Sequence, residues 1–307
     1  MEYDNLKRSD EKVYEALLKE IERVDTGLTL IPSENSPSRA VHDALGTVFN
    51  DKYADGYPGN RDYVECQIID LVENLAIERA KKLFGAEHVN VQPYCGTIAN
   101  IEIYNAMMNP GETFMGLSVE HGGDPSHGDK ASLTSRLFNA VQYGVDRTTS
   151  LLDYDVIRET ALAVRPKVIV CGLSAYPREI NFKAFSEIAE EVGAILLADI
   201  SHIAGLVAGG IYQSPFPYAD VVMTTTHKSL KGPRGAIIMC KEKFAKAIDE
   251  SVYPRIQGGP LENVIAAKAV AFGEALKPEF KIYANQIIKN AKGLAESLME
   301  NGFRLTT

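Results

Sequence analysis

The sequence predicts an α/β fold in which a mostly parallel central sheet is flanked by helices. Three apolar runs, at 168–174, 194–200 and 220–226, are rich in branched residues and predict strands, and a fourth follows at 235–240. The segment FKAFSEIAEEVG, between the first two runs, has the apolar spacing of a helix. Strands that are apolar throughout and alternate with helices are typical of a parallel sheet covered on both faces.

Three longer segments outside these runs also predict helices. Residues 10–24 and 66–84 have helical apolar spacing, and the second helix should stop at Gly85. Residues 278–301 predict the last long helix. The segment TLIPSENSPSRAV contains two prolines and polar residues, and it therefore predicts a structured loop.

These elements suggest three regions along the chain. Residues 1–50 form an N-terminal helical and loop segment, and residues 51–270 form a large α/β domain. Residues 271–307 form a linking helix and the start of a C-terminal domain. Because the final residues, GFRLTT, resemble the beginning of a strand without partners, we expect this small C-terminal domain to be largely missing.

The composition excludes several classes of protein. A net charge of −9 without a basic stripe argues against nucleic acid as a partner, and no apolar run reaches the ~18 residues of a membrane span. The N-terminus is charged throughout, and Cys66, Cys95, Cys171 and Cys240 are scattered without a CxxC pair. We therefore expect a cytoplasmic protein with reduced cysteines. The histidines lack zinc-ligand spacing, so we expect no metal site.

Polar and ionisable side chains follow three of the predicted strands. Ser174 ends the first run, Asp199 and His202 follow the second, and His227 and Lys228 follow the third. Because the carboxyl ends of parallel strands meet at one edge of a sheet, we expect these side chains to form one site.

This combination of residue types favours one cofactor. Burial lowers the pKa of a lysine, so that Lys228 can offer a neutral amine to an aldehyde. A carboxylate such as Asp199 suits a pyridinium nitrogen, and Gly96 and Thr97 open a predicted helix whose N–H groups suit a phosphate. Together they predict pyridoxal 5'-phosphate (PLP). Taken singly, Asp199 could be a turn or capping residue and Lys228 a solvated lysine.

Seven segments carry a resemblance to a known family. In order along the chain they are LIPSEN, DKYADGYPGNRDY, NVQPYCGTIAN, HGGDPSHG, ADISHIAGLVAGG, ADVVMTTTHKSLKGPRG and QGGP. The chain resembles the serine hydroxymethyltransferase (glycine hydroxymethyltransferase) family over nearly all of its length. The resemblance implies a PLP-dependent enzyme with the aspartate-aminotransferase fold (fold type I).

The resemblance also implies roles for individual residues. Lys228 would hold PLP covalently, Asp199 would face the pyridine nitrogen, and His202 and Ser174 would lie beside the cofactor hydroxyl. His202 would also lie near the substrate carboxylate. The remaining implied ligands are Gly96, Thr97 and His227 for the phosphate and Ser33, in LIPSEN, for the substrate carboxylate.

A homodimer with shared active sites is a further implication of the resemblance. The neighbouring chain would supply Tyr53, Asp55 and Tyr63, with Asp55 as the acid/base group and Tyr63 near the substrate, together with Gly259 at the phosphate. These three residues join Lys228 and His202 as implied catalytic residues. The implied reaction interconverts serine and glycine and transfers a one-carbon unit to or from tetrahydrofolate.

Five features depart from the family pattern. Asp124 stands where the family has a histidine stacked on the cofactor ring, and Pro125 beside it replaces an apolar residue near the folate. Asp55 replaces a glutamate and is one methylene shorter. Asp62 replaces an aromatic residue, and Cys95 replaces a serine. The family's arginine clamp for the substrate carboxylate belongs to its C-terminal domain, which this sequence does not reach.

Two other functions therefore stay open. Asp124, Pro125 and Asp55 stand where ring stacking and folate binding are expected, which favours a folate-independent PLP aldolase or transaldolase acting on β-hydroxy amino acids. The missing arginine-bearing domain favours a truncated, non-catalytic relative.

Overall fold

The computed structural model describes residues 3–306 and divides the chain into two compact units that meet after residue 34. In the first unit, a short helix, α1 (Asp4–Ser9), precedes α2 (Glu11–Thr26). Asp10 caps α2, because its carboxylate accepts a hydrogen bond from the N–H of Val13 at 3.1 Å. The helix predicted at 10–24 is confirmed.

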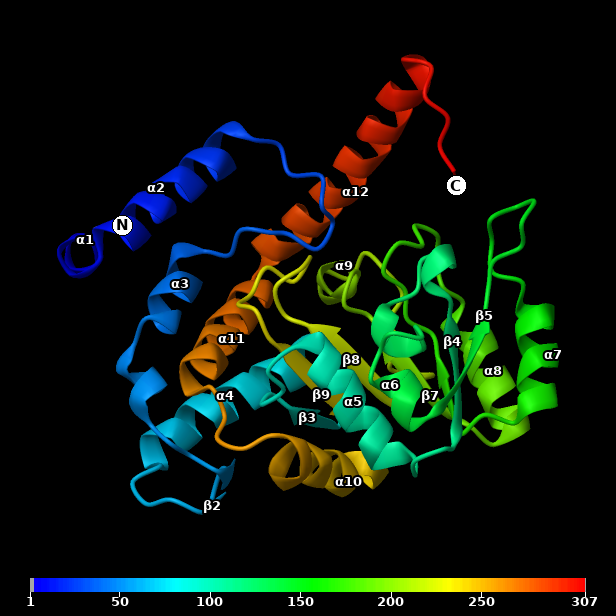
Figure 1. Ribbon diagram of the computed structural model, residues 1–307, viewed down its shortest axis with the longest axis horizontal. Helices are drawn as coiled ribbons and strands as arrows, with labels where there is room; N and C mark the ends of the chain where they lie inside the picture. Colours follow the sequence, from blue (N-terminus) through cyan, green and yellow to red (C-terminus); the bar gives the residue numbers. More distant parts are fainter. Residues whose placement is uncertain (1–2, 307) are drawn as a thin grey trace. The chain divides into compact units, whose positions relative to one another are not determined.

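The second unit is built on a seven-stranded sheet (Figure 1). In spatial order its strands are β3 (His88–Asn90), β9 (Ala236–Cys240), β8 (Val221–Thr225), β7 (Ile195–Asp199), β6 (Val168–Val170), β4 (Thr113–Leu117) and β5 (Asn139–Tyr143). β9 pairs antiparallel with both β3 and β8, and the other neighbours pair parallel. The mostly parallel sheet and the four predicted strands are confirmed. β9 runs antiparallel because the loop after β8 is too short for a helical crossover.

Alternate residues of the central strands pack on opposite faces of the sheet. Ile169, Leu196 and Val222 belong to one core, and Val170, Leu197 and Val221 belong to the other. The first core also contains residues of α4 (Gln67–Phe84), α7 (Tyr154–Val164), α8 (Phe182–Val192) and α11 (Glu262–Ala275). The second contains residues of α5 (Gly96–Met107) and α10 (Ala245–Glu250). The strand sequences are apolar throughout because both faces are buried.

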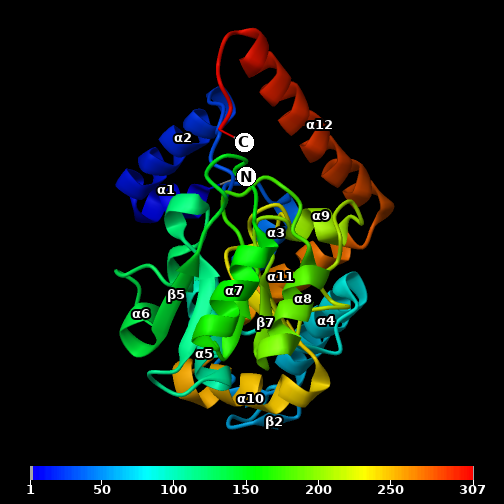
Figure 2. The same cartoon turned by 90° about the vertical axis from the view of Figure 1, so that its right-hand side faces the viewer.

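The long helices also match the prediction. α4 ends at Gly85, whose φ of 73° is the left-handed cap that glycine adopts most easily. The last long helix, α12 (Pro278–Glu300), buries only Phe280 and Ala284 among its residues and runs away from the sheet (Figure 2). Residues 303–306 have no regular secondary structure. Within residues 3–306, no helix is long and apolar enough to cross a membrane.

The sequence patterns did not reveal every element. β3 and β6 span only three residues each, and β5 lies at the sheet edge with a mixed pattern of exposure. The smaller elements are α3 (Arg39–Leu45), α6 (Thr134–Leu137), α9 (Ala204–Ala208), the hairpin β1 (Gly56–Tyr57) and β2 (Asn60–Arg61), and the π-helical turn Ser251–Ile256.

Candidate active site

Lys228 lies in the loop that joins β8 to β9. The main chain closes the base of this loop, where Thr226 N donates to Gly235 O at 3.0 Å. The Thr226 hydroxyl donates to Pro233 O at 2.6 Å, and Lys231 N donates to Lys228 O at 3.0 Å. The loop therefore holds Lys228 at the carboxyl edge of the sheet by internal hydrogen bonds.

The amine of Lys228 faces an imidazole. Lys228 Nζ lies 3.0 Å from His202 Nε2. Burial, followed by the nearby charge of Lys228, lowers the pKa of His202 to about 4. His202 is therefore neutral near pH 7, and Nε2 accepts a hydrogen bond from the amine. Burial also lowers the pKa of Lys228, although Asp199 and Asp124 oppose this effect.

Hydrogen bonds join the segment that carries His202 to the loop that carries Lys228. The Ser229 hydroxyl donates to His202 O at 2.8 Å and accepts from Gly205 N at 3.0 Å. A Cβ on Gly205 would lie 2.2 Å from Ser229 O, so only glycine permits this approach. The hydrogen bonds fix the main chain of His202 against the loop that carries Lys228.

Asp199 ends β7 and accepts hydrogen bonds on both oxygens. Oδ1 accepts from Ser201 N at 3.0 Å and from the Ser201 hydroxyl at 2.6 Å. Oδ2 lies 3.0 Å from His127 Nε2 and 3.4 Å from Asn100 Nδ2. Burial would raise the pKa of Asp199, but hydrogen bonds from His127 and Ser201 hold it well below its usual range. Asp199 is therefore a buried carboxylate, and His127 Nε2 carries a proton toward it.

Asp124 caps the short turn that carries His127. Its Oδ1 accepts from Ser126 N at 2.9 Å and from the Ser126 hydroxyl at 2.5 Å. The Ser174 hydroxyl donates to the other oxygen at 3.4 Å. Asn100 Nδ2 in turn donates to the Ser126 hydroxyl at 2.9 Å. Asp124 is thus joined to Asp199 through Ser126 and Asn100.

Unpaired polar groups gather where α5 begins. Cys95 precedes the helix and makes no side-chain capping bond, which leaves the first N–H groups of α5, at Gly96 and Thr97, pointing outward. Thr225 Oγ1 and His227 Nδ1 are buried and have no hydrogen-bond partner among the described residues. A Cβ on Gly96 would lie 2.7 Å from the Thr225 methyl group, so this end of α5 packs against β8. Burial lowers the pKa of His227 to about 4.

A second group of residues surrounds Gly259. A Cβ at Gly259 would lie 2.9 Å from both Asp55 Oδ1 and Tyr53 Cε1, and the Tyr94 hydroxyl donates to Gly259 O at 2.7 Å. The rings of Tyr53 and Tyr63 pack edge to face, with their centroids 5.4 Å apart. Their exposed fractions are 59% and 48%, and Asp55 Oδ1 has no hydrogen-bond partner in the described chain.

Arg61 anchors the loop that carries this second group. Its side chain donates to Ala54 O at 2.8 Å and to Gly56 O at 2.9 Å. It also pairs with Asp70 at 2.9 Å and with the buried Glu73 at 2.6 Å. Because Ala54 and Gly56 lie on either side of Asp55, Arg61 fixes the main chain from which the Asp55 carboxylate projects.

The sequence also matches a family model over residues 6–307, that of serine hydroxymethyltransferase. The chain belongs to the serine hydroxymethyltransferase family. Members of this family are PLP-dependent enzymes of fold type I that transfer a hydroxymethyl group between serine and glycine, generally with tetrahydrofolate. The sheet described above is the α/β architecture of that fold.

The polar groups at the carboxyl edge of the sheet match the chemical groups of PLP. PLP carries a phosphate, a pyridine nitrogen and an aldehyde. The N-terminus of α5 with Thr225 and His227 suits the phosphate, the ionised Asp199 suits a protonated ring nitrogen, and Lys228 suits the aldehyde. The residues present therefore fit the cofactor.

The structure places the predicted site residues of the second compact unit in two groups. Lys228, His202, Asp199, His227 and the N-terminus of α5 lie at the carboxyl edge of the sheet, with Ser174 joined through Asp124. Tyr53, Asp55, Tyr63 and Gly259 form the second group. Ser33 belongs to the other compact unit, in a turn where Glu34 N donates to Ile31 O, and its predicted contact with substrate stays a prediction.

Sequence reasoning missed the residues that support Asp199. His127 is the second histidine of the HGGDPSHG segment, but nothing in the spacing indicates that it reaches β7. Asn100 and Tyr104 lie on α5, where they look like ordinary helix residues; Tyr104 places its hydroxyl 2.7 Å from His127 Nδ1. The signal that could have found them is the spacing of Asn100 and Tyr104, which lie one helical turn apart and therefore share a face of α5.

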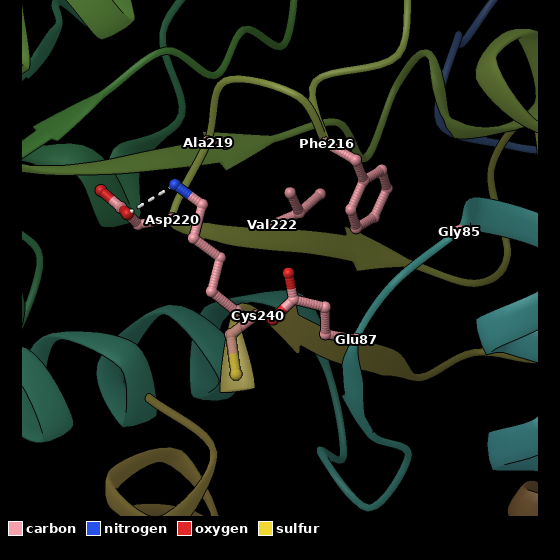
Figure 3. Close-up of a pocket in the computed structure, with 8 residues that line it drawn as sticks. Gly85, Glu87, Phe216, Ala219, Asp220, Val222 and Cys240 are labelled. Atoms are coloured by element: carbon pink, nitrogen blue, oxygen red, sulfur yellow. Dashed lines mark hydrogen bonds and ion pairs between the residues drawn. The ribbon is translucent and has the colours of Figure 1, made fainter. Parts of the chain in front are cut away.

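A small cavity at the opposite edge of the sheet offers no alternative site (Figure 3). It lies where β8 begins and β9 ends, between Val222 and Cys240, and Lys241 Nζ lies 3.0 Å from Asp220 Oδ1 beside it. Its volume of about 30 Å³ suits only water molecules.

Proposed function

We propose that this chain interconverts serine and glycine with PLP held at Lys228, and that a one-carbon unit passes to or from tetrahydrofolate. The observation that carries the proposal is the pairing of Lys228 with a neutral His202, beside the ionised Asp199 at the next strand end. When bound, PLP supplies a ring that accepts the electron pair released when a bond to the amino acid Cα breaks.

The residues around Lys228 have separate tasks in this proposal. Asp199 keeps its negative charge toward the ring nitrogen because His127 and Ser201 donate hydrogen bonds to it. His202 accepts a hydrogen bond from the Lys228 amine and so orients that amine. The lowered pKa of Lys228 increases the fraction of neutral amine near pH 7, which is the nucleophilic form.

The second group acts, in this proposal, on the active site of a neighbouring subunit in a homodimer. Asp55 moves a proton, and Tyr53 and Tyr63 line the substrate side. Two observations support this assignment. Asp55 Oδ1 has no partner among the described residues. The surrounding surface also exposes large apolar side chains, namely Val48, Val64, Ile68, Leu71 and Leu261.

Exchange of the glycine α-proton tests the reaction. Purified protein loaded with PLP would be incubated with glycine in deuterated water, with and without tetrahydrofolate. We expect exchange that tetrahydrofolate accelerates, together with formation of glycine from serine when folate is present. Absence of both reactions in a PLP-loaded protein would refute the proposal.

Asp124 favours a second candidate, a folate-independent aldolase acting on β-hydroxy amino acids. Its carboxylate is held toward Ser126 and Ser174, where it adds negative charge close to Lys228 and His202. Cleavage of threonine or phenylserine at a rate indifferent to tetrahydrofolate, without folate-dependent exchange of glycine, would establish this candidate in place of the first.

A further inference from the structure

Lys268, on α11, is a buried cation that the proposed mechanism does not use. Its side chain is 1% exposed, yet no carboxylate lies within hydrogen-bond distance of its Nζ in the described chain. Nζ instead donates to three main-chain carbonyls: Val91 O at 2.6 Å, Pro93 O at 3.1 Å and Ala236 O at 2.8 Å. Three acceptors use all three N–H groups of an ammonium.

These three carbonyls belong to the two segments that border the proposed phosphate site. Val91 and Pro93 lie between β3 and α5, and Gly96, which opens α5, is three residues after Pro93. Ala236 is the first residue of β9, directly after the loop that carries Lys228. A Cβ at Gly235 would lie 2.7 Å from Lys268 Cε, so Lys268 packs directly against the base of that loop.

Gln257 binds the same stretch of main chain at Gln92 and Tyr94. Its Nε2 donates to Gln92 O at 3.0 Å, and its Oε1 accepts from Tyr94 N at 2.8 Å. The approach to α5 is therefore held by side chains at each residue from Val91 to Tyr94, and Lys268 supplies two of the four bonds. Loss of Lys268 would free Val91 O from its side-chain donor and leave Pro93 O with its bond from Ala236 N at 3.2 Å, while the Gln257 contacts stay in place.

Glutamates on three elements interact with the buried amine, whose pKa burial lowers to about 7. Glu102 lies on α5, Glu73 on α4 and Glu262 on α11, and each favours the charged form of Lys268, against the effect of burial. Both carboxylate oxygens of Glu102 lack hydrogen-bond partners among the described residues. Burial raises the pKa of Glu102 to about 8 and Lys268 opposes this rise, so the ionisation of Lys268 is coupled to a group on the helix whose N-terminus faces the proposed phosphate.

We propose that Lys268 is a positioning residue for the phosphate end of the PLP site. By fixing Val91, Pro93 and Ala236 together, its ammonium sets where the first N–H groups of α5 lie relative to the Lys228 loop. This inference rests on the proposed function, because it takes the N-terminus of α5 as the phosphate site. Lys268 acts through the main chain and does not itself contact the cofactor.

The test compares PLP with pyridoxal, which has the same aldehyde and ring but no phosphate. Dissociation constants of both would be measured on the cofactor-free protein by calorimetry, for the unmodified chain, Lys268→Met and the control Lys281→Met. Met has a similar length and no N–H group, and Lys281 is an exposed lysine on α12. Circular dichroism would verify that each protein is folded.

The inference predicts a selective loss. Lys268→Met should weaken PLP binding by ~10-fold or more and pyridoxal binding by much less, as expected when a supporting contact of a binding site is removed. Lys281→Met should change neither. Equal weakening of both ligands, or no change, would overturn the inference, since a general loss of structure affects both alike.

A second variant keeps the inference testable if Lys268→Met does not fold. Glu102→Gln removes, at nearly constant shape, a group that favours the charged form of Lys268, and it should reduce the preference for PLP over pyridoxal in the same direction but to a smaller extent. An unchanged preference would overturn the inference. If the unmodified chain itself binds PLP no better than pyridoxal, the phosphate site is misplaced and the proposed function fails first.

Discussion

The residues around Lys228 and the residues around Gly259 differ in how far a single chain supplies hydrogen-bond partners for their side chains. Around Lys228, the amine faces His202, and both oxygens of Asp199 accept hydrogen bonds. Around Gly259, Tyr53 and Tyr63 are largely exposed and Asp55 Oδ1 has no partner among the described residues. The first group is thus preorganised within one chain. The second group is held in position by its main chain, but among the described residues Asp55 Oδ1 finds no hydrogen-bond partner.

The same contrast appears in the elements that carry each group. Asp199 ends the buried strand β7, and Lys228 follows the end of its neighbour β8 by three residues, in a loop closed by its own hydrogen bonds. Asp55 lies in a loop that Arg61 fixes through two carbonyls. A sheet edge suits groups that must hold a cofactor rigidly, whereas a projecting loop suits groups that reach another surface.

Removing the amine of Lys228 should have the largest effect. Lys228→Ala deletes the only group at the sheet edge that the proposal assigns to the PLP aldehyde, so activity should fall by ~10³-fold or more. The visible absorbance of covalently bound cofactor should be absent. Lys231→Gln is the matched control, because it removes a cation from the same loop and should keep the absorbance. Retained absorbance in Lys228→Ala would refute the role of Lys228.

Mixing two inactive variants tests whether the second group serves a neighbouring chain. Lys228→Ala and Asp55→Ala should each lose activity by ~10²-fold or more. If the chain forms a dimer with shared sites, refolding an equal mixture should restore about a quarter of normal activity, because half of the dimers are mixed and each has one intact site. No recovery in a mixture shown to contain mixed dimers would place both residues in one chain's site.

The grouping of residues around Lys228 was predictable from the sequence, and the grouping around Gly259 only in part. Asp199, His202 and Lys228 each follow an apolar run, and the carboxyl ends of parallel strands must meet. No such rule brings Tyr53 and Asp55 to Gly259, which lies about two hundred residues later. Their grouping came from family resemblance, and the structure now provides the contacts between them.

Lys268 and Arg61 could not be predicted, for a different reason. Lysine and arginine are seldom fully buried, so Lys268 in AAKAVAFGEAL looks like one polar residue on an apolar helix. Its partners are main-chain carbonyls, as are two of the partners of Arg61. Carbonyl partners leave no trace in a pattern of side chains, and so contacts of this kind become visible only in three dimensions.

Substitution of Asp124 should disturb the residues around Lys228 less than Lys228→Ala does. Asp124→Ala removes the cap of the turn that carries His127, so His127 should hold Asp199 less firmly and activity should fall by ~10-fold. Asp124→Asn can still accept from Ser126 N and should lose less. Steady-state kinetics at saturating PLP would measure both. Equal losses in the two variants would show that the charge of Asp124 matters more than the cap.

The smallest expected effect is a change in the pH dependence of stability. The pKa of His202 falls from 6.5 to about 4 on folding, so between these pH values the unfolded chain binds a proton that the folded chain does not. The contribution of His202 to the free energy of unfolding therefore falls as pH drops from 6.5 toward 4. His202→Gln lacks this contribution, and its stability should fall less steeply in that range.

A companion variant separates the two causes of the His202 shift. Burial is the larger cause and the charge of Lys228 is the next, so Lys228→Met should flatten the same pH profile by less than His202→Gln does. Urea unfolding of the cofactor-free proteins at several pH values would measure the three profiles. An identical slope in His202→Gln and the unmodified chain would mean that His202 titrates alike in both states. The Lys228 site would then be less preorganised in one chain than its contacts indicate, and the contrast with the Gly259 group would weaken.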